Sequence, residues 1–476
     1  MTIADTRKKW LALLVLCLGD LLIVLDVSIV NVALPSIRED LGFSEASLAW
    51  IINAYTLTFG GFMLLAGRLG DLFGHRRLFV GGVGLFTLAS AACGLATSQE
   101  VLVGARAIQG LGGAVVAAVA LSLIMMLFTE PGERAKAMGV IGFVAAGGGS
   151  IGVLAGGVLT DLLSWHWIFL VNLPIGVAVI VFTLMLLPPF RGERGPVRLD
   201  VLGSITVTAS LLVAVYAIVN GNDQGWTSGQ TLGLLAAAVA GLAFFLFHES
   251  RTEAPLMPLG LFRVRSFSSA NVIGVLWSAA MFAMFFLSAL YLQLVLGYSP
   301  LEVGLAFLPA NLIMGAFSLG VSAKLVMRFG IRGPLVGGMT LVALGLGLFA
   351  RVPVDGSFVV DVLPSMIVLG FGIGMAMNPV LLAAMSDVEP QEAGLASGVV
   401  NTSFMMGGAL GLAVLASLAA ARSGDDPSLP ALVDGYQAAF VAGTAFAVAA
   451  AAVAAVFLRA PSPEAAPEGE PALDAV

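Results

Sequence analysis

Long apolar runs alternate with short polar stretches along nearly the whole chain. A run of about 17 to 25 apolar residues is long enough to cross a bilayer as a helix. Fourteen such runs are present, at 11–34, 48–66, 78–97, 101–127, 137–160, 167–188, 201–219, 231–247, 267–296, 303–323, 334–350, 362–385, 395–420 and 437–458. The pattern predicts an all-α polytopic membrane protein with 14 transmembrane helices.

Composition agrees with this class. Apolar residues make up 59% of the chain and charged residues 11%, whereas about a quarter of a soluble domain is charged. The net charge is -7 and the basic residues are dispersed over many loops, so nothing predicts nucleic-acid binding. Cys17 and Cys93 fall inside predicted spans without metal-binding spacing, and no G-x-x-x-x-G-K-[ST] loop occurs. We expect neither an enzyme nor a bound cofactor or metal.

The Lys and Arg residues indicate the orientation, because cytoplasmic loops are enriched in them. With the N-terminus inside, 18 of the 22 fall on the cytoplasmic side. Arg38, Arg351 and Arg422 fall outside, and Arg106 lies within a span. An even number of spans predicts a multi-pass protein of the cell membrane with both termini in the cytoplasm.

An internal repeat divides the chain. Residues 68–82 align with 324–338 at an offset of 256, with Met327 where the first copy has Asp71. A second match, of 133–140 with 392–399, has an offset of 259. Duplicated halves are a common way to build transporters. The predicted division is a six-helix bundle at 1–188, a two-helix insertion at 189–266, a six-helix bundle at 267–460 and a disordered cytoplasmic tail at 461–476.

Four segments resemble one family. GRLGDLFGHRR (67–77), a charged turn between two spans, resembles the loop signature of the major facilitator superfamily. LDVSIVNVALP (25–35), GARAIQGLGGA (104–114) and WHWIFLVNLPIGV (165–177) resemble the first-, fourth- and sixth-span signatures of its fourteen-span drug:proton antiporter family. The resemblance covers almost the whole chain and implies two six-helix bundles with two extra central helices.

Asp26 and Arg106 are the first candidates for function, because an ionisable residue within a span is costly and normally faces a cavity or a partner. The resemblance implies that Asp26 couples protonation to transport and, if both spans line the central cavity, that Arg106 pairs with it. The alternatives are a structural Asp26 and an Arg106 that snorkels to the outer interface. Asp20 lies about 120° away from Asp26 around the helix. It is either a second protonation site or a hydrogen-bonding partner of a neighbouring helix.

The charged turn has two interpretations. The resemblance implies a gating loop in which Asp71 and its basic neighbours latch the halves in the outward-open state. A positive-inside anchor would account for Arg76 and Arg77 alone. The gating residues are Gly67, Arg68, Asp71, Gly74, Arg76 and Arg77.

Glycines recur four apart in GGGSIGVLAGG (147–157), which permits close helix packing. By resemblance this is the antiporter signature of the fifth span, although Val153 replaces the usual Pro. The residues concerned are Gly148, Gly152, Gly156 and Gly157.

Polar, aromatic and Met residues within spans are candidates for a promiscuous substrate cavity. Each of them has the alternative of facing lipid or another helix. The candidates are Asn31, Asn53, Tyr55, Gln109, Trp277, Met281, Tyr291, Asn311, Asn378 and Asn401.

Together these features predict a proton-coupled secondary transporter that exports small amphipathic or hydrophobic compounds, such as drugs, antibiotics and dyes, by alternating access. The alternative is an exporter of lipids or an endogenous metabolite, and a nutrient importer or a non-transporting membrane protein is less favoured. The expected partners are a small-molecule substrate, protons and membrane lipid, with no nucleic acid. We expect a monomer driven by the proton gradient.

Overall fold

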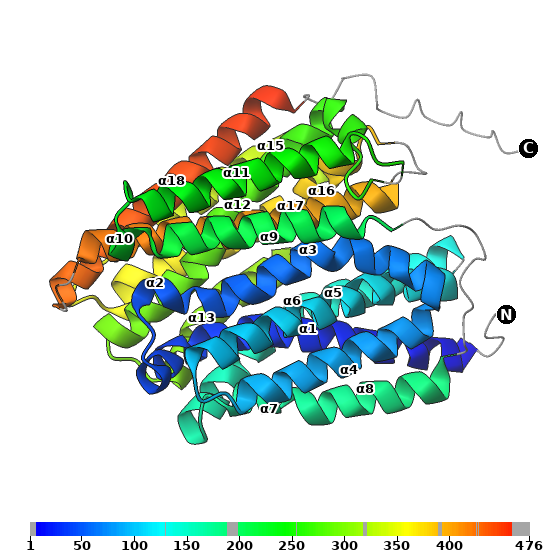
Figure 1. The fold of residues 1–476 in the computed structure, drawn as a ribbon, viewed down its shortest axis with the longest axis horizontal. Coiled ribbons are helices and arrows are strands. Elements are labelled where there is room, and N and C mark those ends of the chain that lie inside the picture. Colours follow the sequence, from blue (N-terminus) through cyan, green and yellow to red (C-terminus); the bar gives the residue numbers. More distant parts are fainter. Residues whose placement is uncertain are drawn as a thin grey trace, which may run out of the picture.

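The structure, a computed structural model, describes residues 6–128, 130–187, 199–253, 255–317, 321–388, 393–424, 426 and 428–458. All regular secondary structure in these ranges is helical, and the long helices run side by side in one elongated bundle (Figure 1). We name its two ends after the glycines at which α1 and α3 end. They are the Gly42 end and the Gly74 end.

The first bundle contains the helices that precede residue 188. Within it α3 packs on α5, α5 on α4, and α1 on α6 and α8. Its elements are α1 (Thr6–Leu41), α2 (Glu45–Leu48), α3 (Trp50–Phe73), α4 (His75–Gly94), α5 (Gln99–Leu127), α6 (Pro131–Leu162), α7 (Trp167–Leu170) and α8 (Asn172–Leu186).

The second bundle repeats this plan, and in it α12 packs on α17 and α18, and α15 on α16. A π-helical turn, Tyr291–Val295, extends α12, and another, Phe358–Val362, precedes α16. The helices are α12 (Arg265–Leu290), α13 (Pro300–Ala316), α14 (Ser322–Phe329), α15 (Arg332–Phe349), α16 (Leu363–Met385), α17 (Ala393–Ser423) and α18 (Leu429–Phe457).

Two further long helices, α9 (Val201–Val219) and α11 (Gly229–Glu249), form an inserted pair. A short α10 (Gly221–Gln224) connects them, and the 3-10 turn Leu259–Arg263 leads on to α12. Helix α9 packs on α3 of the first bundle and on α17 of the second, whereas α11 packs mainly on α9. The pair therefore lies across the seam between the bundles.

The fourteen predicted spans are not all confirmed. Twelve helices of the described residues have the length and hydropathy of a membrane span. Helix α13 is apolar but shorter, and α6, whose residues are only partly described, is not among the twelve.

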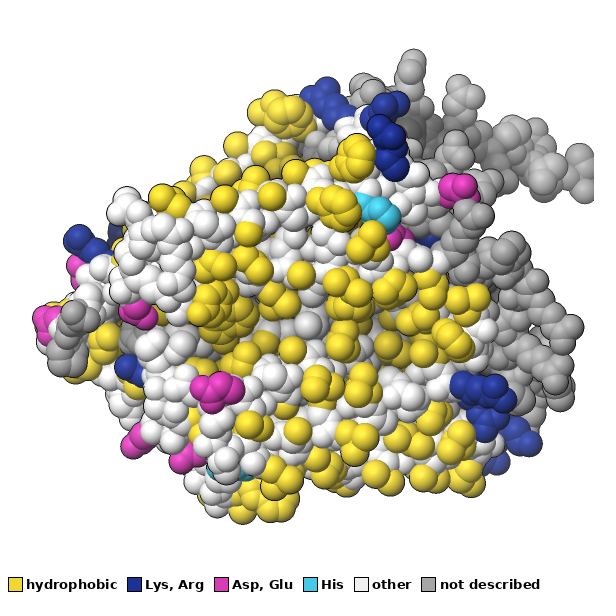
Figure 2. Space-filling model, viewed as in Figure 1, with side chains coloured by type: hydrophobic (Ala, Val, Ile, Leu, Met, Phe, Trp, Pro, Cys, Tyr) yellow, Lys and Arg dark blue, Asp and Glu magenta, His cyan; other side chains and the backbone are white. Residues whose placement is uncertain are grey.

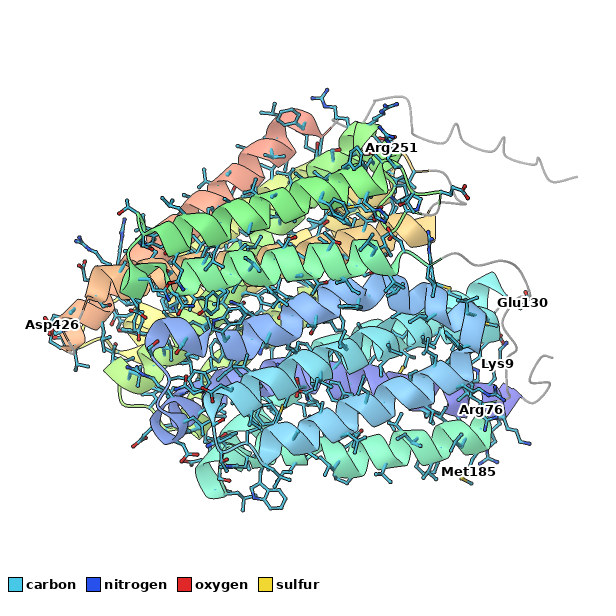
Figure 3. All side chains as sticks on the ribbon, in the orientation of Figure 1. Lys9, Arg76, Glu130, Met185, Arg251 and Asp426 are labelled. Atoms are coloured by element: carbon cyan, nitrogen blue, oxygen red, sulfur yellow. The ribbon has the colours of Figure 1, made fainter. Side chains whose placement is uncertain are left out.

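The surface has the pattern of a membrane protein. On the face shown in Figure 2, hydrophobic side chains cover the broad middle of the molecule and most charged side chains lie toward the two ends. Lys9, Arg76 and Arg251 lie at the Gly74 end and Asp426 at the opposite end (Figure 3). The chain is a multi-pass membrane protein.

The bundles meet closely at the Gly42 end. Gln293 in the π-helical turn after α12 donates a hydrogen bond of 2.8 Å to the carbonyl of Val32 on α1. A Cβ on Gly157 of α6 would lie 2.7 Å from the Cα of Leu301 on α13, so only a glycine permits this approach of the two backbones.

The charged segment 67–77 is not a turn over its whole length. Helix α3 continues through Gly67, Arg68 and Gly70 to Phe73, since a single glycine inside a helix weakens it without ending it. The chain reverses at Gly74 alone, whose φ of 87° is strongly disfavoured for residues with a Cβ.

Candidate functional site

A buried ion pair joins two helices of the first bundle. Nη1 of Arg106 on α5 donates to Oδ2 of Asp26 on α1. The two side chains are 1% and 0% exposed, respectively. The Arg106 Nε also donates to the carbonyl of Ile51 on α3, at 3.0 Å. Arg106 thus does not snorkel to the interface, and its charge is held inside the bundle.

Three further polar side chains complete the network around Asp26. Gln109 donates to Oδ1 of Asp26 at 2.7 Å and to Oγ of Ser90 at 2.8 Å, and its own Oε1 accepts from Arg106 at 2.6 Å. Asn172 donates to the same Asp26 oxygen at 3.3 Å and to Ser90 at 3.4 Å. Both carboxylate oxygens are therefore hydrogen-bonded, as a buried charge requires.

Aromatic rings cover the guanidinium. The Arg106 carbon Cζ lies 4.3 Å from the ring centre of Tyr55 and 5.6 Å from that of Phe169. Such rings attract a cation and keep water away from it. Contributions from α1, α3, α4, α5, α7 and α8 hold the pair together, so it is the polar centre of the first bundle.

The structure brings Asp26 and Arg106 together, and in this conformation the pair is enclosed by helices of the first bundle. Gln109, a predicted cavity residue, is a member of the same network. Chemically, the network stabilises an ionised Asp26, and a proton on Asp26 would remove the charge that holds Arg106.

Asp20 lies apart from this network. Its side chain is half-buried on α1, and no described residue forms a hydrogen bond or ion pair with it. A hydrogen bond to a neighbouring helix, one of the two alternatives for Asp20, is not seen in the part of the chain that the structure describes.

The glycines of α6 make the close contacts that their spacing predicts. Added Cβ atoms on Gly148, Gly152 and Gly156 would meet Leu21, Ser28 and Ile29 of α1, respectively, at 2.8 to 2.9 Å. Gly157 instead faces α13, across the seam between the bundles.

The predicted gating residues are spread along the α3–α4 corner. Arg68 donates to the carbonyl of Pro255, at 3.0 Å, in the connector that follows the inserted pair. Arg76 donates to the carbonyl of Leu184 on α8, at 2.6 Å, and Arg77 is exposed. The side chain of Asp71 lies outside the described part, so its predicted role stays a prediction.

The other cavity candidates come from both bundles, and their role in a substrate cavity stays a prediction. Asn53 and Trp277 are buried, and their side-chain polar atoms have no hydrogen-bond partner among the described residues. The hydroxyl of Tyr291 donates to the carbonyl of Pro353 at 2.7 Å, which fixes this residue at the Gly42 end. The remaining candidates are Asn31 and Asn401, each bonded to its own helix backbone, buried Asn311, and partly buried Met281 and Asn378.

Ser90 and Asn172 are the members of the Asp26 network that the sequence reasoning missed. Asn172 stands within WHWIFLVNLPIGV, an otherwise apolar stretch, and a lone amide there was an available signal. Ser90 carries no such signal, since serine is common in membrane helices.

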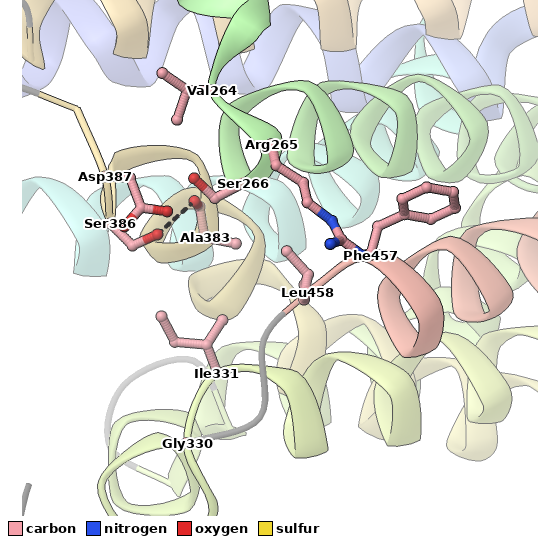
Figure 4. Close-up of a pocket in the computed structure, with 10 residues that line it drawn as sticks. All are labelled: Val264, Arg265, Ser266, Gly330, Ile331, Ala383, Ser386, Asp387, Phe457 and Leu458. Carbon is pink, nitrogen blue, oxygen red and sulfur yellow. Dashed lines mark hydrogen bonds between the residues drawn. The ribbon is translucent and has the colours of Figure 1, made fainter. Parts of the chain in front are cut away.

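One cavity of the second bundle lies away from this network. It has a volume of about 590 Å³, opens at the Gly74 end of the second bundle, and is lined by Arg265, Ile331, Asp387 and Phe457 among others (Figure 4). The guanidinium of Arg265 already forms a hydrogen bond there, since it donates to the carbonyl of Val456 at 3.0 Å. None of the predicted site residues lines this cavity.

Comparison with known proteins identifies the family. The Major Facilitator Superfamily profile matches residues 16–412. A puromycin resistance protein, pur8, of Streptomyces alboniger is 40% identical over 93% of this chain and 89% of its own length. The cephamycin export protein CmcT of Amycolatopsis lactamdurans is 38% identical over 94% of this chain and 92% of its own.

Solved structures agree in fold. A bacterial homologue of the human lysosomal transporter Spinster, in an inward-facing conformation, superposes with a TM-score of 0.67 at 17% identity. The superposition covers 95% of this chain and 97% of the homologue's chain. The nucleoside transporter NupG gives a TM-score of 0.68 at 14% identity, covering 94% of this chain and 100% of its own. The chain belongs to the Major Facilitator Superfamily and is a secondary transporter, not an enzyme.

Proposed function

We propose that this protein exports small amphipathic compounds, antibiotics among them, in exchange for protons. The observation that carries the proposal is the enclosed Asp26–Arg106 pair, the one place in the described residues where a buried carboxylate and a buried guanidinium meet. Relatives named for puromycin resistance and cephamycin export support the choice of substrate class.

The proposed orientation places the Gly74 end in the cytoplasm. The described residues near this end include Lys9, Arg68, Arg76 and Arg251, and basic residues mark cytoplasmic loops. Both termini are then cytoplasmic, and the Gly42 end, where the bundles are in contact, faces outward. The conformation is accordingly one that is closed to the outside.

The proposed cycle alternates the protonation of Asp26. When the Gly42 end is open, a proton from outside binds Asp26, neutralises it and weakens its hold on Arg106. When that end closes, the proton leaves to the cytoplasm and the ion pair forms again, as in the present conformation. A proton can drive the cycle only because it binds the two conformations with different affinity.

The bundles 1–188 and 267–460 are proposed to rock against one another about a substrate site between them. The two-helix insertion 189–266 is proposed to stay packed across the seam. We infer a monomer in lipid, because each chain carries both bundles and a complete ion-pair network. No bound cofactor has a role in this cycle.

The test is transport by purified protein in liposomes with an imposed proton gradient. Puromycin, a cationic dye and a fluorescent lipid are the probes. Uphill export of puromycin or dye, accompanied by proton movement, supports the proposal. Movement of the lipid alone would favour lipid export. Transport at the same rate with and without the proton gradient would overturn proton coupling.

A further inference from the structure

A second group of buried ionisable side chains lies outside the Asp26 network, where the inserted pair ends near the connector 250–258. Asp200 caps the N-terminus of α9, and its Oδ1 accepts from the Gly203 backbone at 2.8 Å. The same oxygen lies 2.8 Å from Nε2 of His248. Next to His248, Oε2 of Glu249 accepts from the Met257 backbone at 3.0 Å.

The other two carboxylate oxygens both lie beside Gly203. Oδ2 of Asp200 and Oε1 of Glu249 are buried, and no donor to either oxygen occurs among the described residues. The Glu249 oxygen lies 2.8 Å from the point where a Cβ on Gly203 would stand, and the Asp200 oxygen lies closer still to that point. The two residues are only 4% and 3% exposed, respectively.

Two ionised carboxylates in this position would repel each other without solvent to screen them. No group of His, Cys, Asp and Glu suited to a metal ion occurs among the described residues. A single proton resolves the conflict, because the protonated carboxyl then donates to the ionised one.

We propose that Asp200 and Glu249 form a proton-binding site, separate from Asp26, that holds one proton between them and fastens the inserted pair to α3. The proton resides on Glu249 and is donated to Oδ2 of Asp200. On deprotonation it leaves to water through a depression of about 280 Å³ lined by Asp200, Thr252 and Glu253.

The connector transmits the state of this site to the gating loop. Its Met257 amide binds Glu249, and its Pro255 carbonyl, two residues earlier, accepts from Arg68 of α3. Loss of the proton makes Glu249 withdraw from Asp200, which displaces Met257 and loosens the bond of Arg68. The inserted pair then holds the first bundle less tightly at the Gly74 end.

Few other charges face the site from the described residues. His248 contacts Asp200, Arg251 lies over the ring of Phe247, 5.0 Å from its centre, and Glu253 lines the depression. The charged residue that α3 contributes is Arg68, which donates to the carbonyl of Pro255 in the connector.

The charge state of Asp200 agrees with this assignment. Burial by itself raises the pKa of Asp200, but hydrogen bonds from Glu249 and from the Gly203 amide lower it. The contact with His248 lowers it further, and the pKa of Asp200 lies below its ordinary value. Asp200 is therefore the ionised partner of the pair.

Infrared difference spectra of the purified full-length protein, recorded between acid and alkaline pH, test for the shared proton. A protonated carboxyl has a carbonyl band that histidine lacks. We expect a band that vanishes on alkalinisation in the wild type, is missing in Glu249→Gln and in Asp200→Asn, and persists in Asp26→Asn. A spectrum unchanged by both Glu249→Gln and Asp200→Asn overturns the site.

Spin labels at the exposed positions Phe73 and Arg251 test the link to α3. The distance distribution should broaden at alkaline pH in the wild type and stay narrow at every pH in Glu249→Gln, whose amide still donates to Asp200. A distribution that ignores pH in the wild type, or one that broadens equally in Glu249→Gln, overturns the link. Because Asp26→Asn should respond as the wild type does, failure here is distinguishable from failure of proton-coupled export.

Discussion

The guanidinium of Arg106 and the carboxylate of Asp26 are in direct contact inside the first bundle, although the residues are 80 positions apart. Neither side chain is accessible to solvent in this conformation. The bundle therefore contains a charge pair whose two members depend on each other.

Replacing one member of the pair should destabilise the protein. Replacing both members should restore much of the lost stability. Arg106→Ala leaves Asp26 buried without its counter-ion, at a cost of about 3–5 kcal/mol. We expect a clear loss of Tm in detergent for Arg106→Ala and substantial recovery in Arg106→Ala/Asp26→Asn. Arg77→Ala, at an exposed position, is the control and should match the wild type. A double variant no more stable than Arg106→Ala would contradict the dependence.

Gly157 should control closure at the Gly42 end. Gly157→Val places its Cβ 2.7 Å from the Leu301 backbone, so α6 and α13 cannot approach as they do here. We expect transport to fall at least tenfold and a cysteine introduced near the seam to become more reactive from the Gly42 end. Gly147→Val is the matched control on the same helix, since nothing lies within 4 Å of its added Cβ. Equal transport by the two variants would refute this role.

The reversal at Gly74 should require glycine. With φ at 87°, Gly74→Ala is expected to destabilise the protein by about 1–2 kcal/mol. Gly81→Ala, on the exposed face of α4 with nothing within 4 Å, should instead be neutral or stabilise by about 0.5–1 kcal/mol. Thermal unfolding of both variants measures the difference, and similar Tm values would show that the corner tolerates a side chain.

Asp200 should contribute stability that depends on pH. Its folded pKa lies below its ordinary value of 3.8, so the contribution is complete above that value and is lost as the pH falls through the folded pKa. Asp200→Ala should therefore lower the Tm at neutral pH, with the gap to the wild type narrowing in acid. Ser228→Ala removes a cap that does not titrate, on α11. The Tm difference between Ser228→Ala and the wild type should therefore stay constant with pH. A Tm difference for Asp200→Ala that is also constant with pH would contradict the assignment.

The sequence predicted the all-helical membrane class well because a bilayer requires long apolar helices. Helix ends were less predictable. Polar residues in the last turns of α3 reduced its hydropathy, and the predicted span ended at residue 66, although the helix continues to Phe73.

Asp26 and Arg106 could be recognised from the sequence because charged residues deep in a span are rare. Their enclosure was not predictable, because it depends on side chains from four other helices, including Phe169 of α7 and Asn172 of α8. The Asp200–Glu249 group escaped notice for a related reason. Both residues stand at span ends, where a charge is ordinary, and only the packing of α9 on α11 buries them.

The most direct test of the account is proton-driven export by Asp26→Asn in liposomes. Asn retains the shape of a protonated Asp but cannot release a proton. We predict that uphill puromycin export and substrate-induced proton release are both lost, while substrate exchange without a gradient continues. Uphill export at the wild-type rate by Asp26→Asn would contradict the central role of Asp26.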